Sequence, residues 1–157
     1  MAAVSAPPAV AEFLRGKRIA VAGVSRNPGQ AANAIYQKLR RSGFAVFPIN
    51  PNAEQVEGVP CYRDVASLPE PVDGVVVATH PNDAPGIVGQ CAAAGIRRVW
   101  FHRSFGQGSV SEAAVRECAA HGIEPIVGGC PLMFCEPVDV GHKCIRWWLQ
   151  RRGRVPR

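Results

Sequence analysis

Arg18-Ile-Ala-Val-Ala-Gly-Val-Ser-Arg-Asn-Pro-Gly-Gln-Ala-Ala-Asn33 carries the strongest fold signal in this chain. A continuous apolar run, typical of a strand buried on both faces, passes through a turn of small residues into a helix. Such a unit presents backbone N–H groups and the positive end of a helix dipole to a phosphate. The next glycine after Gly23 is Gly29, so the spacing G-x5-G departs from the G-x-G-x-x-G fingerprint of dinucleotide-binding folds. The stretch therefore predicts a phosphate site that is neither a Walker loop nor a standard NAD site.

Strands and helices alternate along the rest of the chain. Apolar runs predict strands over 18–22, 45–49, 74–78, 98–101 and 123–127, and helical patterns cover 30–42, 85–94 and 111–121. Crossovers of this length make neighbouring strands parallel, with right-handed connections. We therefore predict a single α/β domain, a Rossmann-like doubly wound parallel sheet of about five strands in the order 3-2-1-4-5.

Composition and charge limit the possible classes of protein. The chain has 157 residues, of which 47% are apolar and 19% charged, which suits one globular domain. No apolar run approaches the ~20 residues that span a bilayer, and the first ten residues lack the basic cluster of a signal peptide. Six scattered cysteines without a C-x-x-C pair suit a reducing compartment. We expect a cytoplasmic protein without membrane contact.

The positive charge is concentrated at the C-terminal end. The chain carries 18 Lys and Arg against 12 Asp and Glu, and residues 141–157 hold six of the basic residues and no acid. Because the excess basic residues lie in a tail and do not form a broad basic face, a nucleic-acid partner is not expected. We expect a flexible lead over 1–11, after which a short helix begins at Glu12, a domain over 12–135, and a basic extension over 136–157.

Five short loops at the carboxyl ends of the predicted strands converge on one crevice. In the first, Gly23 allows close backbone approach, Ser25 offers a hydroxyl, and Arg26 can pair with phosphate. Asn27 and Pro28 shape the turn before the helix. An ordinary turn with incidental polar residues is the alternative, and the joint occurrence of Gly, Ser and Arg favours the anion site.

The second loop argues against NAD, and the third offers polar side chains to the crevice. No acidic residue ends the second strand, where a Rossmann site uses one to bind ribose. Asn50 suits either a ribose contact or a plain turn, and Pro51 offers a flat face for adenine. His80 and Asn82 follow the third strand and face the crevice. A lone histidine in such a place is more often a loop hydrogen-bonding residue than a catalyst.

Later residues provide candidates for chemistry. His102 and Arg103 follow the fourth strand and permit acid–base catalysis, although no nucleophile pairs with them. Cys130 lies between a glycine and a proline, so we expect its thiol to open into the crevice. The spacing C-x4-C-x6-H-x-C that begins there matches no common zinc module, and we expect no metal. Trp147 and Trp148 suit docking on the fold or a homodimer formed through the C-terminal extension.

Four segments together resemble a known family. They are Val21-Ala-Gly-Val-Ser25, Val46-Phe-Pro-Ile-Asn-Pro51, Gly58-Val-Pro-Cys-Tyr62 and Gly129-Cys-Pro131. Their order and spacing over residues 12–135 resemble the stand-alone CoA-binding domain proteins of bacteria, which are similar to the CoA-binding domain of the succinyl-CoA synthetase α subunit. The resemblance implies coenzyme A as the ligand, with its phosphates on the first loop, its adenosine on the second, its pantetheine arm on the third and its far end on the last. The residues so implied are Gly23, Val24, Ser25, Arg26, Asn27, Pro28, Asn50, Pro51, His80, Pro81, Asn82 and Cys130.

Departures from the synthetase pattern narrow the expected activity. Lysines near the nucleotide are missing; Arg26 is the nearest substitute, and Asn52 follows Pro51. The synthetase domain that carries the phosphorylated histidine is absent from this sequence, so ligase activity is not implied. We therefore expect non-catalytic binding of CoA or an acyl-CoA. The alternative is an NAD(P)-linked or acyl-transfer enzyme on the same scaffold that uses His80, His102 or Cys130.

Overall fold

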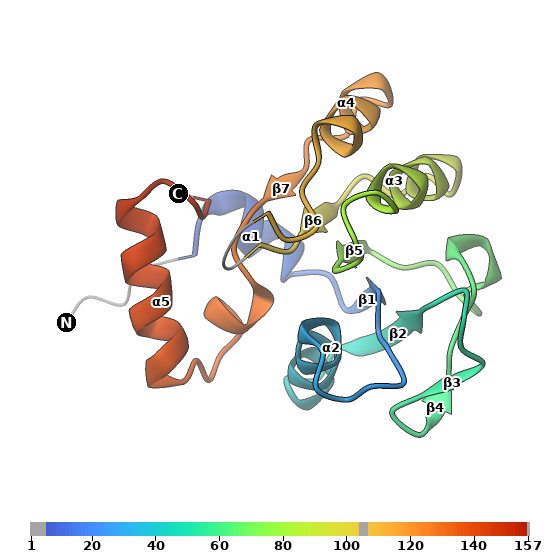
Figure 1. Ribbon diagram of the computed structural model, residues 1–157, viewed down its shortest axis with the longest axis horizontal. Coiled ribbons are helices and arrows are strands. Elements are labelled where there is room, and N and C mark those ends of the chain that lie inside the picture. The colour runs from blue at the N-terminus through green and yellow to red at the C-terminus, as the bar shows by residue number, and fades with distance from the viewer. Residues whose placement is uncertain (1–5, 104–106, 157) are drawn as a thin grey trace.

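A five-stranded parallel sheet forms the centre of the computed structural model, which describes residues 6–103 and 107–156 (Figure 1). The strand order is β2-β1-β5-β6-β7. A separate two-stranded antiparallel hairpin, β3-β4, follows β2. The strands are β1 (Arg18–Ala22), β2 (Ala45–Ile49), β3 (Gln55–Val56), β4 (Val59–Pro60), β5 (Gly74–Val77), β6 (Val99–Phe101) and β7 (Ile126–Val127).

The predicted α/β class is confirmed, but the predicted strand order is wrong. The third long strand, β5, pairs with β1 rather than lying beyond β2, so the order is 2-1-3-4-5. Burial explains this arrangement, since every residue of Gly74–Val77 is buried and therefore suits the middle of the sheet. Strand β2 begins with the exposed Ala45 and suits an edge. Tyr62 also occupies that edge, because its N–H donates to the Pro48 carbonyl at 3.0 Å.

Helices cover both faces of the sheet. Residues on one side of β1, Ile19 and Val21, share a core cluster with the first, second and fifth helices, and Ala20 and Ala22 on the other side share a cluster with the third and fourth. This alternation reflects the two-residue period of a strand. The helices are α1 (Pro8–Phe13), α2 (Ala31–Arg41), α3 (Ala84–Ala93), α4 (Glu112–Ala120) and α5 (Val140–Arg151), with short 3-10 turns η1 (Val65–Ser67) and η2 (Pro131–Met133).

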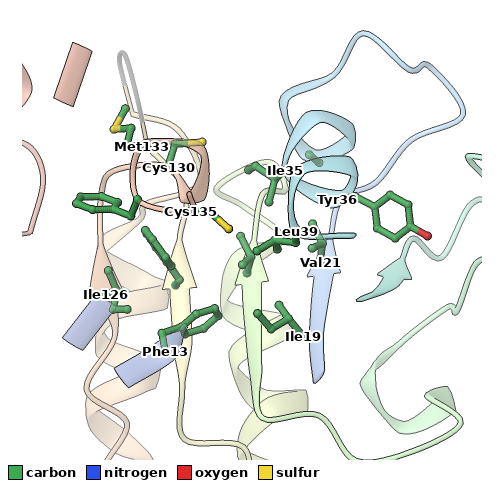
Figure 2. Close-up of a cluster of buried hydrophobic side chains, with 14 of the residues drawn as sticks. Phe13, Ile19, Val21, Ile35, Tyr36, Leu39, Ile126, Cys130, Met133 and Cys135 are labelled. Atoms are coloured by element: carbon green, nitrogen blue, oxygen red, sulfur yellow. The ribbon is translucent and has the colours of Figure 1, made fainter. Parts of the chain in front are cut away.

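Trp100 lies at the centre of the first cluster. Its side chain is fully buried, and its indole N–H donates to the Gly128 carbonyl at 2.9 Å. The ring of Phe13 meets it edge-on at 5.4 Å. Figure 2 shows Phe13 and Ile126 at one end of this cluster and the α2 side chains near β1 at the other. Burying Phe13 beside Trp100 draws the preceding residues into the fold.

The N-terminal helix begins earlier than predicted. It begins at Pro8 rather than Glu12, and Val10 within it is fully buried. Residues 8–11 of the predicted flexible lead are therefore part of the packed structure. Residues 1–5 lie outside the described part of the chain.

Most other predicted boundaries differ from the structure by one or two residues. Strands β1 and β2 have the predicted bounds, and Gly43 ends α2 with a φ of +92°. Ser111 caps α4, because its hydroxyl accepts the Ala114 N–H at 3.1 Å. The last strand is shorter than predicted and begins at Ile126. The β3-β4 hairpin was not predicted at all.

We expect Leu149→Ala to lower the free energy of unfolding by about 2–5 kcal/mol, the usual cost of such a core cavity. Leu149 of α5 is fully buried in the first cluster, so this substitution tests whether the C-terminal extension belongs to the cooperative unit. The measurement is urea unfolding followed by circular dichroism. Cys144→Ala on the exposed side of the same helix is the control. If Leu149→Ala lowered the free energy of unfolding no more than Cys144→Ala does, α5 would unfold independently of the core.

We expect Asp73→Asn to destabilise the protein at pH 7 and much less at pH 3. The carboxylate of Asp73 accepts the N–H groups of Lys17 and Arg18 at 2.8 and 2.9 Å, which lowers its pKa below the ordinary value. Because the folded-state pKa is depressed, this stabilisation exists above the unfolded-state pKa and is lost as pH falls through the folded-state pKa. Urea unfolding at several pH values measures the difference.

The control for that experiment is Glu70→Gln. Glu70 makes an exposed ion pair with Arg18 at 3.7 Å, and such pairs contribute little. The role assigned to the ionised carboxylate would be contradicted if wild type and Asp73→Asn differed in free energy of unfolding by the same amount at pH 7 and at pH 3.

Candidate binding cleft at the carboxyl ends of the strands

A cleft of about 610 Å³ lies at the carboxyl ends of β1, β2 and β5. The chain leaves β1 toward α2 on one face of the sheet and leaves β5 toward α3 on the other. The cleft therefore opens at the topological switch point, where ligands bind in sheets of this class. Its lining residues are Ala22, Gly23, Ser25, Gln30, Ile49, Asn50, Pro51, Asn52, Ala78, Thr79, His80, Asn82, Asp83, Gly86, Ile87 and Gln90.

Gly23 allows the two central strands to meet at the base of the cleft. Its φ is +105°, and a Cβ at this position would lie 2.4 Å from the carbonyl oxygen of Ala78. Any side chain would therefore push β1 and β5 apart in addition to straining the backbone. The close approach that the structure shows at Gly23 is that of the protein's own backbone, and the predicted approach to a ligand stays a prediction.

Asn33 holds the first loop in place from inside α2. Its side chain is 1% exposed, accepts the Ser25 N–H at 2.9 Å and donates to the Ser25 carbonyl at 2.8 Å. It also donates to Glu57 at 2.7 Å, and the other oxygen of Glu57 accepts a hydrogen bond from Gln37 at 2.6 Å. The hairpin turn between β3 and β4 is thereby fastened to the loop. Sequence analysis missed this network, because its members are distant in sequence.

The first loop contributes fewer cleft residues than predicted. Gly23 and Ser25 line the cleft, whereas Val24 is fully buried. Arg26, Asn27 and Pro28 are exposed and lie outside the lining. The Ser25 hydroxyl accepts the Asn27 N–H at 3.0 Å, and the Asn27 side chain accepts the Gly29 N–H at 3.1 Å. The Ser25 and Asn27 side chains therefore shape the turn, and the phosphate contact predicted for this loop stays a prediction.

Asn50 both lines the cleft and builds the second loop. Its amide group donates to the Val24 carbonyl at 2.9 Å, and its oxygen accepts the Asn52 N–H at 2.9 Å. The side chain thus forms a turn and ties the end of β2 to the first loop. Pro51 and Asn52 complete this wall of the cleft.

The third loop and α3 form the opposite wall. His80 and Asn82 line it and Pro81 does not. The Nδ1 atom of His80 accepts the Asn82 N–H at 3.3 Å, the loop hydrogen bond that a histidine in this place was expected to make. Asp83 stands at the N-cap position of α3 without a side-chain cap bond.

The face of α3 that meets the cleft was not predicted. Asp83, Gly86, Ile87 and Gln90 follow the spacing i, i+3, i+4, i+7, which places them on one side of the helix. That spacing was available in the sequence and is the signal that could have found them. The oxygen of Gln90 also accepts the Val65 N–H at 3.1 Å, so this wall is attached to η1.

Of the candidate catalytic residues His80, His102 and Cys130, only His80 lines the cleft. His102 and Arg103 are absent from its lining. Burial lowers the pKa of His102, which favours the neutral form of its imidazole. The described residues hold no group of three or more His, Cys, Asp and Glu side chains suited to a metal ion. Across 6–103 and 107–156, every helix is too short or too polar to span a bilayer.

A second cleft of about 700 Å³ lies at the opposite, amino end of the sheet beside α1. Most of the charged side chains that line it are engaged within the protein. Arg98 pairs with Glu12 at 2.7 Å, and Arg97 donates to the carbonyls of His121 and Gly122 at 2.8 and 3.3 Å. The cleft at the carboxyl ends is therefore the stronger candidate for a ligand site.

Comparison with known proteins identifies the family. The sequence model of the CoA binding domain matches residues 17–136, which span all five strands of the parallel sheet. The chain belongs to the CoA-binding domain family. The resemblance inferred from the four sequence segments is thereby confirmed.

Relatives of this CoA-binding domain include both large ligases and small proteins. It is 30% identical over 124 residues to acetate–CoA ligase (ADP-forming) II of Archaeoglobus fulgidus, covering 74% of this chain and 18% of the ligase. It is 26% identical over 116 residues to the uncharacterized protein YneT of Bacillus subtilis, covering 74% of this chain and 83% of that protein. The chain thus spans less than a fifth of the ligase.

Solved structures show the same fold. A hypothetical protein from Pyrococcus horikoshii matches with a TM-score of 0.74 and 25% identity, over 87% of this chain and 98% of that one. A dinucleotide-forming acetyl-coenzyme A synthetase from Ca. Korarchaeum cryptofilum, in complex with phosphate and ADP, matches with a TM-score of 0.61 and 28% identity. That match covers 71% of this chain and 25% of the synthetase.

In this CoA-binding domain the expected position of Cys130 is wrong. Cys130 is 2% exposed, belongs to the core cluster beside Met133 and Cys135, and does not line the cleft (Figure 2). The C-terminal segment covers the adjacent turn. A Cβ on Gly128 would lie 2.6 Å from the carbonyl oxygen of Arg154, which shows how closely that segment packs. The thiol is therefore directed into the core rather than into the crevice.

We expect Asn33→Ala to accelerate hydrogen exchange at the Ser25 amide in the ligand-free CoA-binding domain and to cost about 1–3 kcal/mol of stability, because a polar group loses its partner. Amide exchange measured by mass spectrometry or NMR reports on the loop directly. Gln37→Ala is the matched control, since it removes a bond to Glu57 and leaves both Ser25 bonds intact. Similar Ser25 exchange in the two variants would contradict the role of Asn33.

Proposed function

We propose that this chain binds coenzyme A or an acyl-CoA in the cleft at the carboxyl ends of β1, β2 and β5, and that it performs no catalysis itself. One observation carries the proposal: a cleft at the switch point of the sheet, beside the first loop and α2, in a chain of the CoA-binding domain family. The chemistry of the ligand, with an adenosine, phosphates and a long pantetheine arm, suits a cleft lined by several loops with polar edges.

The start of α2 supports the binding of phosphate. Gln30 is the N-cap residue, lines the cleft and makes no side-chain cap bond to the helix. The first N–H groups of a helix need partners, and an anion supplies them well. Arg26 is exposed on the same loop and is the nearest cation to this end of the cleft in the sequence. The diphosphate is therefore assigned to the space between Ser25 and Gln30.

The remaining walls suit the other parts of the ligand. Pro51 provides an apolar face for adenine, and Asn52 and Asn50 provide polar edges beside it. The pantetheine arm is assigned to the wall formed by His80, Asn82 and α3. Gly86 leaves room there, since a Cβ added to it would meet no atom within 4 Å.

The composition of the cleft supports binding without catalysis. Its lining includes two ionisable side chains, His80 and Asp83, and His80 is engaged in a loop hydrogen bond. Neither is paired with a nucleophile in the lining, so the elements of an acyl-transfer site are not assembled. The ligase activity named for the larger relatives belongs to proteins of which this chain spans a small part.

Gly86→Leu tests the location of the site. Leucine favours a helix more than glycine does, so we expect the variant to be at least as stable as wild type while its side chain occupies the cleft. Isothermal titration with CoA and acetyl-CoA should show binding to the wild type and about tenfold or more weaker binding to the variant, or ~1.4 kcal/mol. Gly89→Ala in the same helix is the control, because Gly89 lies outside the cleft lining.

Three results would overturn the proposal. Wild-type protein that fails to bind either compound at about millimolar concentration lacks the proposed activity. Wild-type protein that binds NADH or NADPH more tightly than CoA supports the nicotinamide alternative instead. Equal CoA binding by wild type and Gly86→Leu would place the ligand elsewhere on the molecule.

A further inference from the structure

The cleft at the carboxyl ends of the strands is poor in positive charge. Among the described residues, no lysine and no arginine belongs to its lining. Its two ionisable side chains are His80, whose Nδ1 atom accepts the Asn82 N–H, and the acidic Asp83. Coenzyme A carries a diphosphate and a separate phosphate on the 3′-oxygen of its ribose. The lining therefore lacks the side chains that would attract both groups by charge.

Two helices begin beside the cleft, and they differ in what they offer to an anion. Helix α2 begins after Gln30, whose side chain makes no cap bond, and the diphosphate is assigned to this end of the cleft. Helix α3 begins after Asp83, so a carboxylate already stands at the positive end of its dipole. A phosphate at that helix would meet a like charge. The cleft thus offers one favourable place for phosphate, and the diphosphate occupies it.

The cations nearest to the cleft along the chain lie outside its lining. Arg26 is exposed on the first loop, at the end assigned to the diphosphate. Arg63 is exposed and follows Tyr62, whose carbonyl accepts the Asn50 N–H at 2.9 Å. Residues 50–64, which run from the second loop past the β3-β4 hairpin, contain this one arginine and three acidic residues. The surroundings of the adenosine wall therefore carry no excess of positive charge.

A neutral amide occupies the polar edge of that wall. Asn52 lines the cleft next to Pro51, the residue assigned to adenine, and its side chain is exposed. Its backbone N–H is already bonded to the Asn50 side chain at 2.9 Å. An exposed amide can replace water as a partner of a hydroxyl or a phosphate oxygen with little net gain, whereas strong attraction to phosphate uses lysine or arginine.

We propose that this cleft does not recognise the 3′-phosphate of coenzyme A. Its ligands are then adenosine diphosphates that carry a pantetheine arm, with or without the 3′-phosphate, so dephospho-CoA binds as well as CoA. The 3′-phosphate lies in solvent beside Asn52. The inference rests on the proposed function, because it concerns the same ligand in the same cleft.

Isothermal titration of the whole chain with CoA and with dephospho-CoA tests this proposal. We expect the two dissociation constants to agree within about threefold, because a phosphate that stays hydrated adds little to binding. Their ratio should also stay constant as the salt concentration rises, since screening acts on charge pairs that the 3′-phosphate does not make. Tighter binding of CoA beyond threefold would overturn the inference. Tighter binding of dephospho-CoA would support it, because the 3′-phosphate would then contribute no attraction.

Asn52→Lys should create the preference that the wild type lacks. The position is exposed, so we expect the fold to be unaffected. A lysine beside the 3′-phosphate should tighten CoA binding about three- to tenfold more than dephospho-CoA binding. Gln55→Lys is the matched control, because it makes the same change of charge at an exposed residue outside the lining. An equal effect of Asn52→Lys on both compounds would overturn the place assigned to the phosphate.

Two arginine variants test whether a cation outside the lining reaches the 3′-phosphate. Arg26→Gln should weaken the binding of both compounds to the same extent, because the diphosphate is common to them, and Arg63→Gln should leave both unchanged. A loss confined to CoA in either variant would overturn the inference. Failure of the wild type to bind either compound would overturn the proposed function together with this inference. A strong preference of the wild type for CoA would overturn this inference alone.

Discussion

The fold depends on the enclosure of β1, which lies between β2 and β5 and is covered on both faces. Ile19, Val21, Ala20 and Ala22 are all fully buried, two on each side of the sheet. Hydrogen bonds continue past the strand ends, from the Gly23 N–H to the Ile49 carbonyl and from the Ala78 N–H to the Ala22 carbonyl, both at 2.9 Å. Beyond these bonds the chain diverges toward opposite faces. The cleft is the space left by that divergence, so its position follows directly from the burial of one strand.

Polar side chains then determine the shape of the cleft. Asn33 and Asn50 each bond backbone groups of the first loop, at Ser25 and at Val24. Both therefore act on the site through the backbone, whether or not they touch a ligand. Buried amide networks of this kind favour one loop conformation, because each alternative leaves polar groups without partners. A residue that looks like a ligand contact in the sequence can thus serve first to hold the loop.

The sequence contains enough information for the elements but not for their arrangement. Apolar runs and terminal glycines located β1, β2, α2 and α3 closely, because those signals are local. Strand order could not be obtained in the same way, since an apolar run does not show which strand it pairs with. Only the pairing of Ile19 with Gly74, and of Ala22 with Val77, decides between the two orders. The burial of Cys130 likewise depends on residues 154–156, which pack on its neighbouring turn.

That packing shows that the C-terminal segment is part of the folded domain. Residues 136–157 stand out in the sequence by charge, which suggests an appendage, yet Leu149 and Val155 are buried in the same cluster as Trp100. Their contacts cover the turn after β7, where the family resemblance would place the far end of the ligand. The segment therefore closes the fold on its inner side and presents the paired tryptophans on its outer side. Because one helix carries both faces, anything that covers the outer face also helps to hold the inner face against the turn.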